Sequence, residues 1–199
     1  MKSHRNKGLM GVGTLIIFIA IILIAAVASS VLITTGGSLQ QKALVTGVQT
    51  EESVASGVEA ISLMATDASE NHSVQHFELL IRMQSGSEPI NLNNSVITVD
   101  TTDTYQNLDY NTTIDKNLFS ALSGGTHHFI VQYVKQGPDN ENGYLNRGDV
   151  VKLKFNTINA IDENQKIRIR FIPRVGQMTQ IDVMTPDVMS DQRVQLWPT

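Results

Sequence analysis

The chain has 199 residues, of which 17% are charged, and a formal net charge of −4 at pH 7. This acidic balance disfavours nucleic-acid binding, because a protein that binds phosphates needs a basic surface. The absence of cysteine excludes disulfides, zinc–thiolate sites, iron–sulfur clusters and cysteine nucleophiles. The length allows one domain, or one domain with an additional element.

The first eight residues form a short basic leader. Lys2, Arg5 and Lys7 carry its positive charge, and it contains no acid. A positive segment ahead of an apolar stretch holds the N-terminus on the cytoplasmic side during membrane insertion. We therefore expect residues 1–8 to direct the next segment into a membrane.

Residues 9–33 form an uncharged apolar segment, and no charged residue or histidine occurs between residues 9 and 41. As a helix this segment would extend roughly 37 Å, enough to cross a bilayer core of ~30 Å. It fits a permanent membrane anchor. It is longer than the apolar core of an ordinary secretory signal, although residues 25–30 resemble a conventional cleavage site. A third interpretation is a class III, prepilin-type signal, which is cut between Gly8 and Leu9, next to Lys7, and keeps the helix.

Cleavage after Gly8 would change the electrostatics of the chain. It removes three positive charges, leaving 12 Lys and Arg against 19 Asp and Glu, a net charge of −7. The remaining segment could then leave the bilayer, because no ionic group has to be drawn through hydrocarbon. A helix that is apolar on every face must be buried on every face, and copies of itself can bury it. The large residues predicted to form such a core are Leu15, Ile16, Ile17, Phe18, Ile19, Ile21, Ile22, Leu23, Ile24, Val27, Val31 and Leu32.

The apolar pattern becomes one-sided after residue 33. Gly36 and Gly37 predict a bend. Apolar residues then recur at helical spacing, which predicts that an amphipathic helix continues to Thr66; they are Leu44, Val48, Val54, Val58, Ile61 and Ala65. The predicted organisation is a leader at 1–8, a helix at 9–66, roughly 87 Å long, and an outer domain at 67–199.

Residues 7–43, "KGLMGVGTLIIFIAIILIAAVASSVLITTGGSLQQKA", resemble the N-terminus of archaeal flagellins, or archaellins. The closest matches are residues 11–16 (GVGTLI) and 39–43 (LQQKA). Residues 86–99, "GSEPINLNNSVITV", resemble an early strand of archaellin outer domains. Bacterial type IV pilins usually carry a glutamate shortly after the cleavage point, whereas residues 9–13 contain no acid.

The resemblance implies a structural subunit of the archaeal swimming filament, the archaellum. A prepilin-type peptidase would remove the leader, the precursor would reside transiently in the membrane, and the mature chain would polymerise with itself or with other archaellins outside the cell. Two alternatives remain: an adhesive archaeal type IV-like pilin, and a monomeric surface binding module that keeps residues 1–8 as part of a membrane anchor.

The remaining residues, 67–199, alternate in polarity with a period of two in several short stretches. Residues 151–155 (VKLKF) and 166–172 (KIRIRFI) place apolar side chains on one face and basic side chains on the other. Such stretches, separated by Gly, Asn, Asp and Pro, predict strands. The predicted fold class is α+β: a long N-terminal hydrophobic helix followed by an antiparallel, Ig-like β-sandwich.

Three Asn-X-Ser/Thr sequons lie in the outer region, at Asn71, Asn93 and Asn111, and none lies in the apolar segment. Single sequons are common by chance, but this distribution is typical of an exported surface. We expect at least one of the three to carry an N-linked glycan.

The sequence contains one candidate for a structural Ca²⁺ site, the oxygen-rich stretch at residues 137–149 (GPDNENGYLNRGD). Its possible ligands are Asp139, Asn140, Asn142 and Asp149. The spacing does not match an EF-hand, and an ordinary hairpin loop with an Asn-Gly turn is the favoured interpretation. The histidines predict no metal pair, since His127 and His128 would face opposite sides of a strand. No G-x-S-x-G, H-E-x-x-H or glycine-rich phosphate loop occurs, so we expect no enzymatic activity and no required cofactor.

Overall fold

The computed structural model of the chain describes residues 3–68, 72–111 and 127–198, with side chains from residue 10 onward. It divides into two compact units, residues 1–50 and residues 51–199. Each unit is described by itself below.

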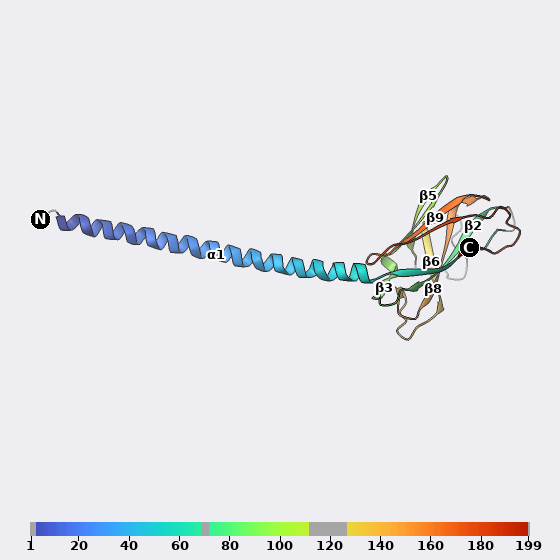
Figure 1. Ribbon diagram of the computed structural model, residues 1–199, viewed down its shortest axis with the longest axis horizontal. Helices are drawn as coiled ribbons and strands as arrows, with labels where there is room; N and C mark the ends of the chain where they lie inside the picture. The colour runs from blue at the N-terminus through green and yellow to red at the C-terminus, as the bar shows by residue number, and fades with distance from the viewer. Residues whose placement is uncertain (1–2, 69–71, 112–126, 199) are drawn as a thin grey trace. The chain divides into compact units, whose positions relative to one another are not determined.

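A single helix, α1 (Ser3–Ala55), contains the whole apolar segment. Its 53 residues correspond to a length of roughly 80 Å. The helix continues through Gly36 and Gly37, and Figure 1 shows no sharp bend along it, so the bend predicted there is wrong. The glycines lower helix propensity, but no proline interrupts the backbone hydrogen bonds.

The end of the helix differs from the prediction. Helix α1 ends at Ala55 rather than at Thr66, and strand β1 (Val58–Ala65) follows it after two residues. The apolar spacing in this stretch is compatible with both structures. Pairing decides between them, because β1 is hydrogen-bonded to a strand on either side. The transition from helix to β-domain therefore lies at residues 56–57.

Residues 58–197 contain a nine-stranded sheet in the described part of the chain, in the order β10-β9-β4-β5-β6-β8-β2-β1-β11. All neighbouring pairs are antiparallel except β5 and β6, which are parallel. The remaining strands of this sheet are β2 (Val74–Met83), β4 (Val96–Thr101), β5 (Tyr105–Tyr110), β6 (His128–Lys135), β8 (Val150–Ile161), β9 (Lys166–Ile172), β10 (Thr179–Met184) and β11 (Val194–Trp197). A small second sheet joins β3 (Ile90–Asn91) to β7 (Tyr144–Leu145), and a 3-10 turn, η1 (Leu92–Asn94), follows β3.

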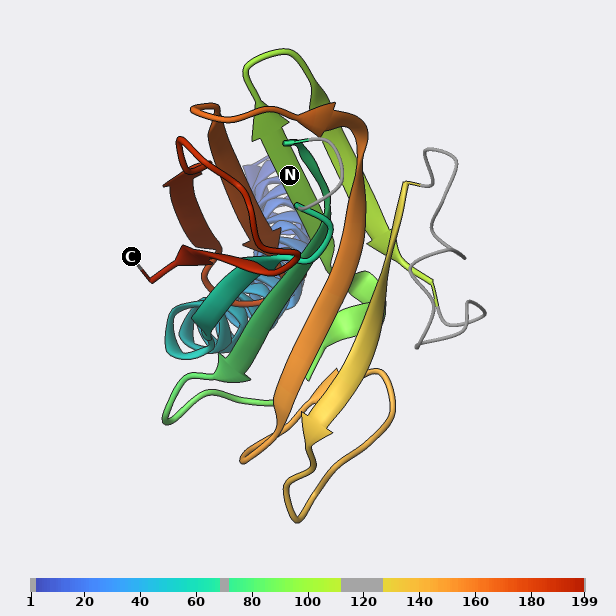
Figure 2. The same cartoon turned by 90° about the vertical axis from the view of Figure 1, so that its right-hand side faces the viewer.

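The predicted fold class is confirmed as a long helix followed by a mostly antiparallel β structure, with one difference. The predicted sandwich has two separate sheets, whereas nine strands of this domain form one continuous hydrogen-bonded sheet. The sheet curls until edge strand β10 lies against β11 and β1, and Figure 2 shows the strands surrounding a common interior. Register shifts in several pairings supply the local twist that such curling needs.

The interior of the β-domain is one apolar core. The alternating stretches face inward as predicted, since Leu153, Phe155 and Ile169 are fully buried. The rings of Phe77 and Phe155 stack with centroids 5.7 Å apart. Burying aromatic side chains of this size stabilises the fold by several kcal/mol in total, on the order of 1.5–3 kcal/mol for each.

Candidate functional site

The surface of α1 is the most unusual feature of the chain. The twelve large residues predicted to form a helical core are all between 49% and 71% exposed. The stretch Met10–Ala55 is long and apolar enough to cross a membrane, and none of its most apolar part is buried. Because apolar side chains cover every face, the helix needs a lipid or protein environment. This surface is therefore a binding surface.

Several hydroxyl groups within this apolar helix are bonded to carbonyls of the helix itself. The Thr34 hydroxyl donates to the Ser30 carbonyl at 2.8 Å, and the Thr35 hydroxyl donates to the Val31 carbonyl at 2.7 Å. The Thr14 hydroxyl donates to a carbonyl three residues earlier. Hydroxyls bonded in this way leave no donor that needs water. The helix can thus be buried among apolar neighbours without leaving these groups unpaired.

The last turns of α1 have a different surface. Leu44 and Val48 are exposed apolar residues, and Glu51 and Glu52 are the only acids in the helix. Residues 44, 48 and 51 are spaced so that they share one face. This part of the helix offers an apolar stripe with negative charge at its C-terminal end.

Hydrogen bonds attach the end of the helix to the β-domain. The Gly57 amide donates to the Ser87 hydroxyl at 2.9 Å, and the Gln177 amide donates to the Ser56 carbonyl at 2.8 Å. Gly57 also forms a parallel bridge with Gln177. A Cβ atom at Gly57 would lie 2.4 Å from the Gln84 side-chain oxygen, so a larger residue here would displace the end of that flexible side chain. Residues 56–57 are consequently held by two separate loops.

The sequons differ in what the structure describes of them. Asn93 is exposed in η1, and its amide N–H donates to the Asn91 side chain. Asn111 is half-buried, and its amide donates to the Phe129 carbonyl at 3.1 Å. Asn71 lies outside the described residues. Accessibility therefore favours Asn93 as an acceptor, and glycosylation stays a prediction.

The candidate Ca²⁺ loop is organised around the buried carboxylate of Asp149. One carboxylate oxygen accepts from the Gly137 amide at 2.7 Å and from the Asn140 side-chain amide at 3.2 Å. The other accepts from the Asn146 amide at 2.9 Å. These donors occupy the directions from which a cation would be coordinated. The arrangement fits a hydrogen-bonded loop better than a metal site.

The other proposed ligands do not converge on Asp149 as oxygen donors. Asp139 contributes its backbone carbonyl, which accepts from the Asn146 side chain. Asn142 lies in the turn before Gly143, which has a φ of 86° and so supplies the left-handed conformation of the Asn-Gly turn. The Tyr133 hydroxyl donates to the Tyr144 carbonyl at 2.7 Å beside this turn, and burial raises the pKa of this hydroxyl.

Replacing Asp149 tests the two interpretations of this loop. Asp149→Asn should lower the free energy of unfolding of the β-domain by about 2 kcal/mol, because three donors lose a charged acceptor. Asp139→Asn should change it little, because its backbone carbonyl makes the contact. Thermal unfolding of the detergent-solubilised chain measures both. A Ca²⁺ site would instead make both variants unstable and would make the unmodified chain sensitive to a chelator.

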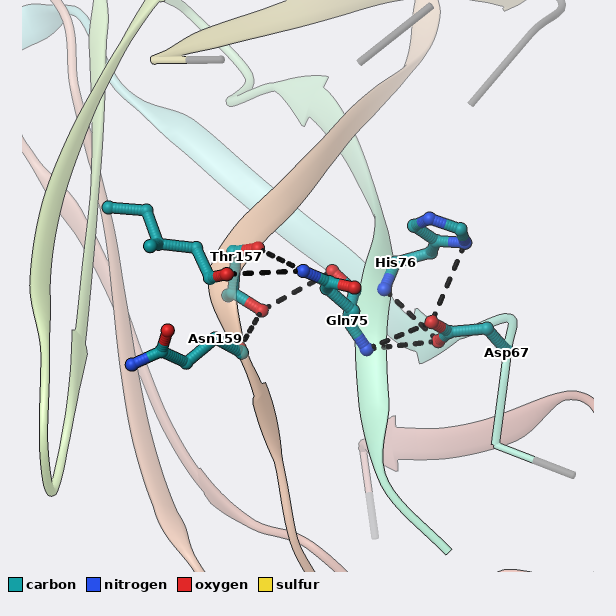
Figure 3. A network of polar contacts seen from close by, with 6 residues as sticks. Asp67, Gln75, His76, Thr157 and Asn159 are labelled. Atoms are coloured by element: carbon teal, nitrogen blue, oxygen red, sulfur yellow. Dashed lines mark hydrogen bonds and ion pairs between the residues drawn. The ribbon is translucent and has the colours of Figure 1, made fainter. Parts of the chain in front are cut away.

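The histidines take separate acidic partners. His72 lies 3.4 Å from Glu163, and His128 lies 2.6 Å from Asp109. Figure 3 shows the carboxylate of Asp67 facing both the His76 ring and the backbone of β2, where it accepts from the amides of Gln75 and His76. Within the described residues no group of three or more metal-binding side chains forms.

The β-domain also carries a charged cluster that no local pattern in the sequence indicates. Glu78 is only 7% exposed and lies 2.8 Å from Arg193, 2.9 Å from Lys152 and 4.0 Å from Lys154. Burial lowers the pKa of the Lys154 ammonium, Glu78 opposes this effect, and the charges of Lys152 and Arg193 add to it. The alternation in 151–155 indicated that the two lysines share a face, but nothing local indicated their common partner.

Together, a bare apolar helix and a separate β-domain define a chain whose helix needs a lipid or protein environment. A family model described as archaeal-type flagellin matches residues 8–183. The chain belongs to the archaeal-type flagellin family.

Individual relatives agree with this assignment. The chain is 34% identical to flagellin B2 of Methanocaldococcus jannaschii, covering 91% of this chain and 90% of the relative. It is 33% identical to flagellin B5 of Pyrococcus abyssi, covering 96% and 99% respectively.

Two solved structures share the fold. The crystal structure of an archaeal flagellin from Methanocaldococcus jannaschii aligns with a TM-score of 0.63 at 24% identity, covering 71% of this chain and 97% of that one. The archaeal flagellum of Methanospirillum hungatei aligns with a TM-score of 0.65 at 18% identity, covering 94% of this chain and 98% of that one.

Proposed function

We propose that this chain is the structural subunit of an archaeal swimming filament and polymerises outside the cell through α1. The observation that carries the proposal is the exposed apolar surface of α1 in a chain of the archaeal-type flagellin family. Burial of this surface among copies of the same helix removes apolar area from water, which is the main driving force for association. Internally bonded hydroxyls allow that burial at little polar cost.

The basic leader and its boundary with the apolar segment indicate the route to the filament. The basic leader directs insertion with the N-terminus in the cytoplasm. A prepilin-type peptidase then cuts between Gly8 and Leu9, which removes all three positive charges that precede the apolar segment. In support of this position, the match to the family begins at Gly8. The helix, which then has no charged side chain before Lys42, transfers from lipid into the growing bundle.

The polymer is held by contacts between different surfaces of neighbouring copies. Contacts of this kind that do not close on themselves generate an open helical filament. The β-domain, whose core is independent of the helix, forms the outer part of the subunit. Its sequons would then be presented on the outside of the filament, with Asn93 the most accessible of those described.

Mass spectrometry of the N-terminus of the native protein tests the assembly route. We expect filament subunits to begin at Leu9, and we expect a Gly8→Val variant to keep residues 1–8 and to form no filaments. A conservative change within the leader, Lys7→Arg, serves as the control and should be processed normally. Filaments whose subunits retain Lys2 would contradict the proposal, and a monomeric, unprocessed membrane protein would support the anchored binding module instead.

Deleting the chain from its host distinguishes swimming from adhesion. Loss of swimming with attachment unchanged is the expected result. Loss of attachment with swimming unchanged would assign the filament to an adhesive pilus.

A further inference from the structure

A second apolar surface lies on the β-domain, at the end where α1 joins it. Val96 begins β4, Ile172 ends β9, and Val175 and Met178 lie in the loop between β9 and β10. Their exposed fractions are 36%, 38%, 43% and 59%. Val96 pairs directly with Ile172, and Met178 directly precedes Thr179, which pairs with Phe171, the neighbour of Ile172. We call these four residues the basal patch.

The basal patch continues onto the last turn of the helix. The backbone of Gln177, between Val175 and Met178, donates to the Ser56 carbonyl at 2.8 Å. Its side chain donates to the carbonyl of Val54 at 3.4 Å, and Val54 is 66% exposed. The loop that carries Val175 and Met178 is therefore bonded to the last turn of α1, next to the exposed Val54.

Positive charge lies directly next to the basal patch. Arg170 is two residues before Ile172 in β9, and its Nε is buried with no hydrogen-bond partner within the described residues. The hydroxyl of Thr98, which is opposite Arg170 in β4, also has no partner there. Buried polar atoms normally have partners. The Asp182 carboxylate lies close enough to interact electrostatically with Arg170, but the Arg170 Nε keeps no bonded acceptor in the described part of the chain. The exposed Arg174 adds a second cation, so an apolar partner that also carries an acceptor or an acid complements this surface.

We propose that the basal patch binds the segment at residues 44–54 of α1 from a second copy of the chain. Leu44, Val48 and Glu51 share one face of that segment, and Glu51 and Glu52 are the only acids in α1. The more N-terminal part of the helix offers no acid for Arg170 or Arg174. The basal patch is too small to hold a stable dimer by itself, and it acts together with burial of the apolar helix. The inference therefore rests on the proposed filament function.

Cysteine cross-linking tests which segments meet, because the natural chain contains no cysteine. Two single-cysteine variants, Val48→Cys and Met178→Cys, are produced together, and disulfide-linked peptides from purified filaments are identified by mass spectrometry. We expect a peptide that joins positions 48 and 178, which must come from two copies. The matched control replaces Met178→Cys by Met184→Cys, at the other end of β10 and similarly exposed at 50%, and should give no such peptide.

Introducing a charge at position 178 and measuring filament yield gives an independent test of the same contact. Met178→Glu should reduce the filament yield at least ten-fold while processed protein accumulates in the membrane, and Met184→Glu should leave the yield unchanged. Unfolding of the β-domain of each solubilised variant checks that the fold is retained.

The results separate this inference from the proposed function. Normal filaments without the joined peptide, or equal filament yields for Met178→Glu and Met184→Glu, overturn the inference and leave the proposed function standing. An unmodified chain that forms no filaments overturns both.

Discussion

An Ile22→Lys variant should reach the membrane, lose its leader and form no filaments. Ile22 lies near the middle of the apolar segment and is 50% exposed in the free chain. One lysine at the centre of a membrane helix costs about 3 kcal/mol, which the surrounding apolar residues can offset during insertion. In the assembled bundle every copy would bring the same charge into a water-free interior, where neither a counter-ion nor an acidic partner is present in the apolar part of α1.

Electron microscopy of the cell surface and fractionation of the processed protein measure this effect together. Ile22→Val is the matched control for shape, and Gln41→Lys is the control for an added charge at the polar end of the segment. Both should assemble. Filaments of ordinary length from the Ile22→Lys chain would show that the helix is not buried in the assembly. Absence of the variant from the membrane would be recognised as an insertion defect by the fractionation.

A Glu78→Gln substitution should destabilise the β-domain by about 3 kcal/mol at pH 7. Glu78 is the acid at the centre of Lys152, Lys154 and Arg193, and breaking a buried ion pair by removing one partner costs a few kcal/mol. We expect a loss at the lower end of the range for buried ion pairs, because Arg193 is about half exposed. Chemical unfolding of the solubilised chain measures the loss.

The pH dependence of this variant distinguishes charge repulsion from lost packing. Burial already lowers the pKa of Lys154, and loss of Glu78 removes the one charge that raises it. As pH rises and Lys154 loses its proton, its repulsion with Lys152 and Arg193 is lost in the variant, so the stability difference from the unmodified chain should narrow toward alkaline pH. A packing defect would give the same difference at every pH.

Glu59→Gln is the matched control for this experiment. Glu59 forms an ion pair with Arg82 at 3.0 Å, but both side chains are more than half exposed. The pKa of the Glu59 carboxyl lies below its ordinary value because Arg82 donates hydrogen bonds to it. Exposed pairs of this kind contribute little to stability, so we expect no measurable loss.

At the junction of α1 and β1, the local sequence pattern does not decide between helix and strand. Val58, Ile61 and Ala65 have a spacing that a helix and a bulged strand can both use, and β1 carries such a register shift. The choice depends on β2 and on β11, and β11 begins more than 125 residues further along the chain. The same reason explains the curled sheet, since strand alternation predicts which faces are buried but not which strands become neighbours.

The candidate sites also differ in whether local sequence or distant contacts determine them. The apolar face of α1 was predictable because the absence of charge over residues 9–41 is a local property. The role of Asp149 was not, because its acidic and amide neighbours are compatible with a cation site as well as with the favoured hairpin loop. Only the observed positions of the Gly137, Asn140 and Asn146 donors favour the loop.

The sequence by itself determined that this protein has a helix that water cannot solvate, a basic leader ahead of it, and an outer region of alternating strands. These properties are set by the composition and spacing of adjacent residues, so no distant contact is needed to infer them. The tertiary structure alone decided where the helix ends, how the sheet closes, and that Glu78 gathers three cations. Each of these results depends on residues far apart in the chain, and only the folded backbone brings such residues within hydrogen-bonding distance.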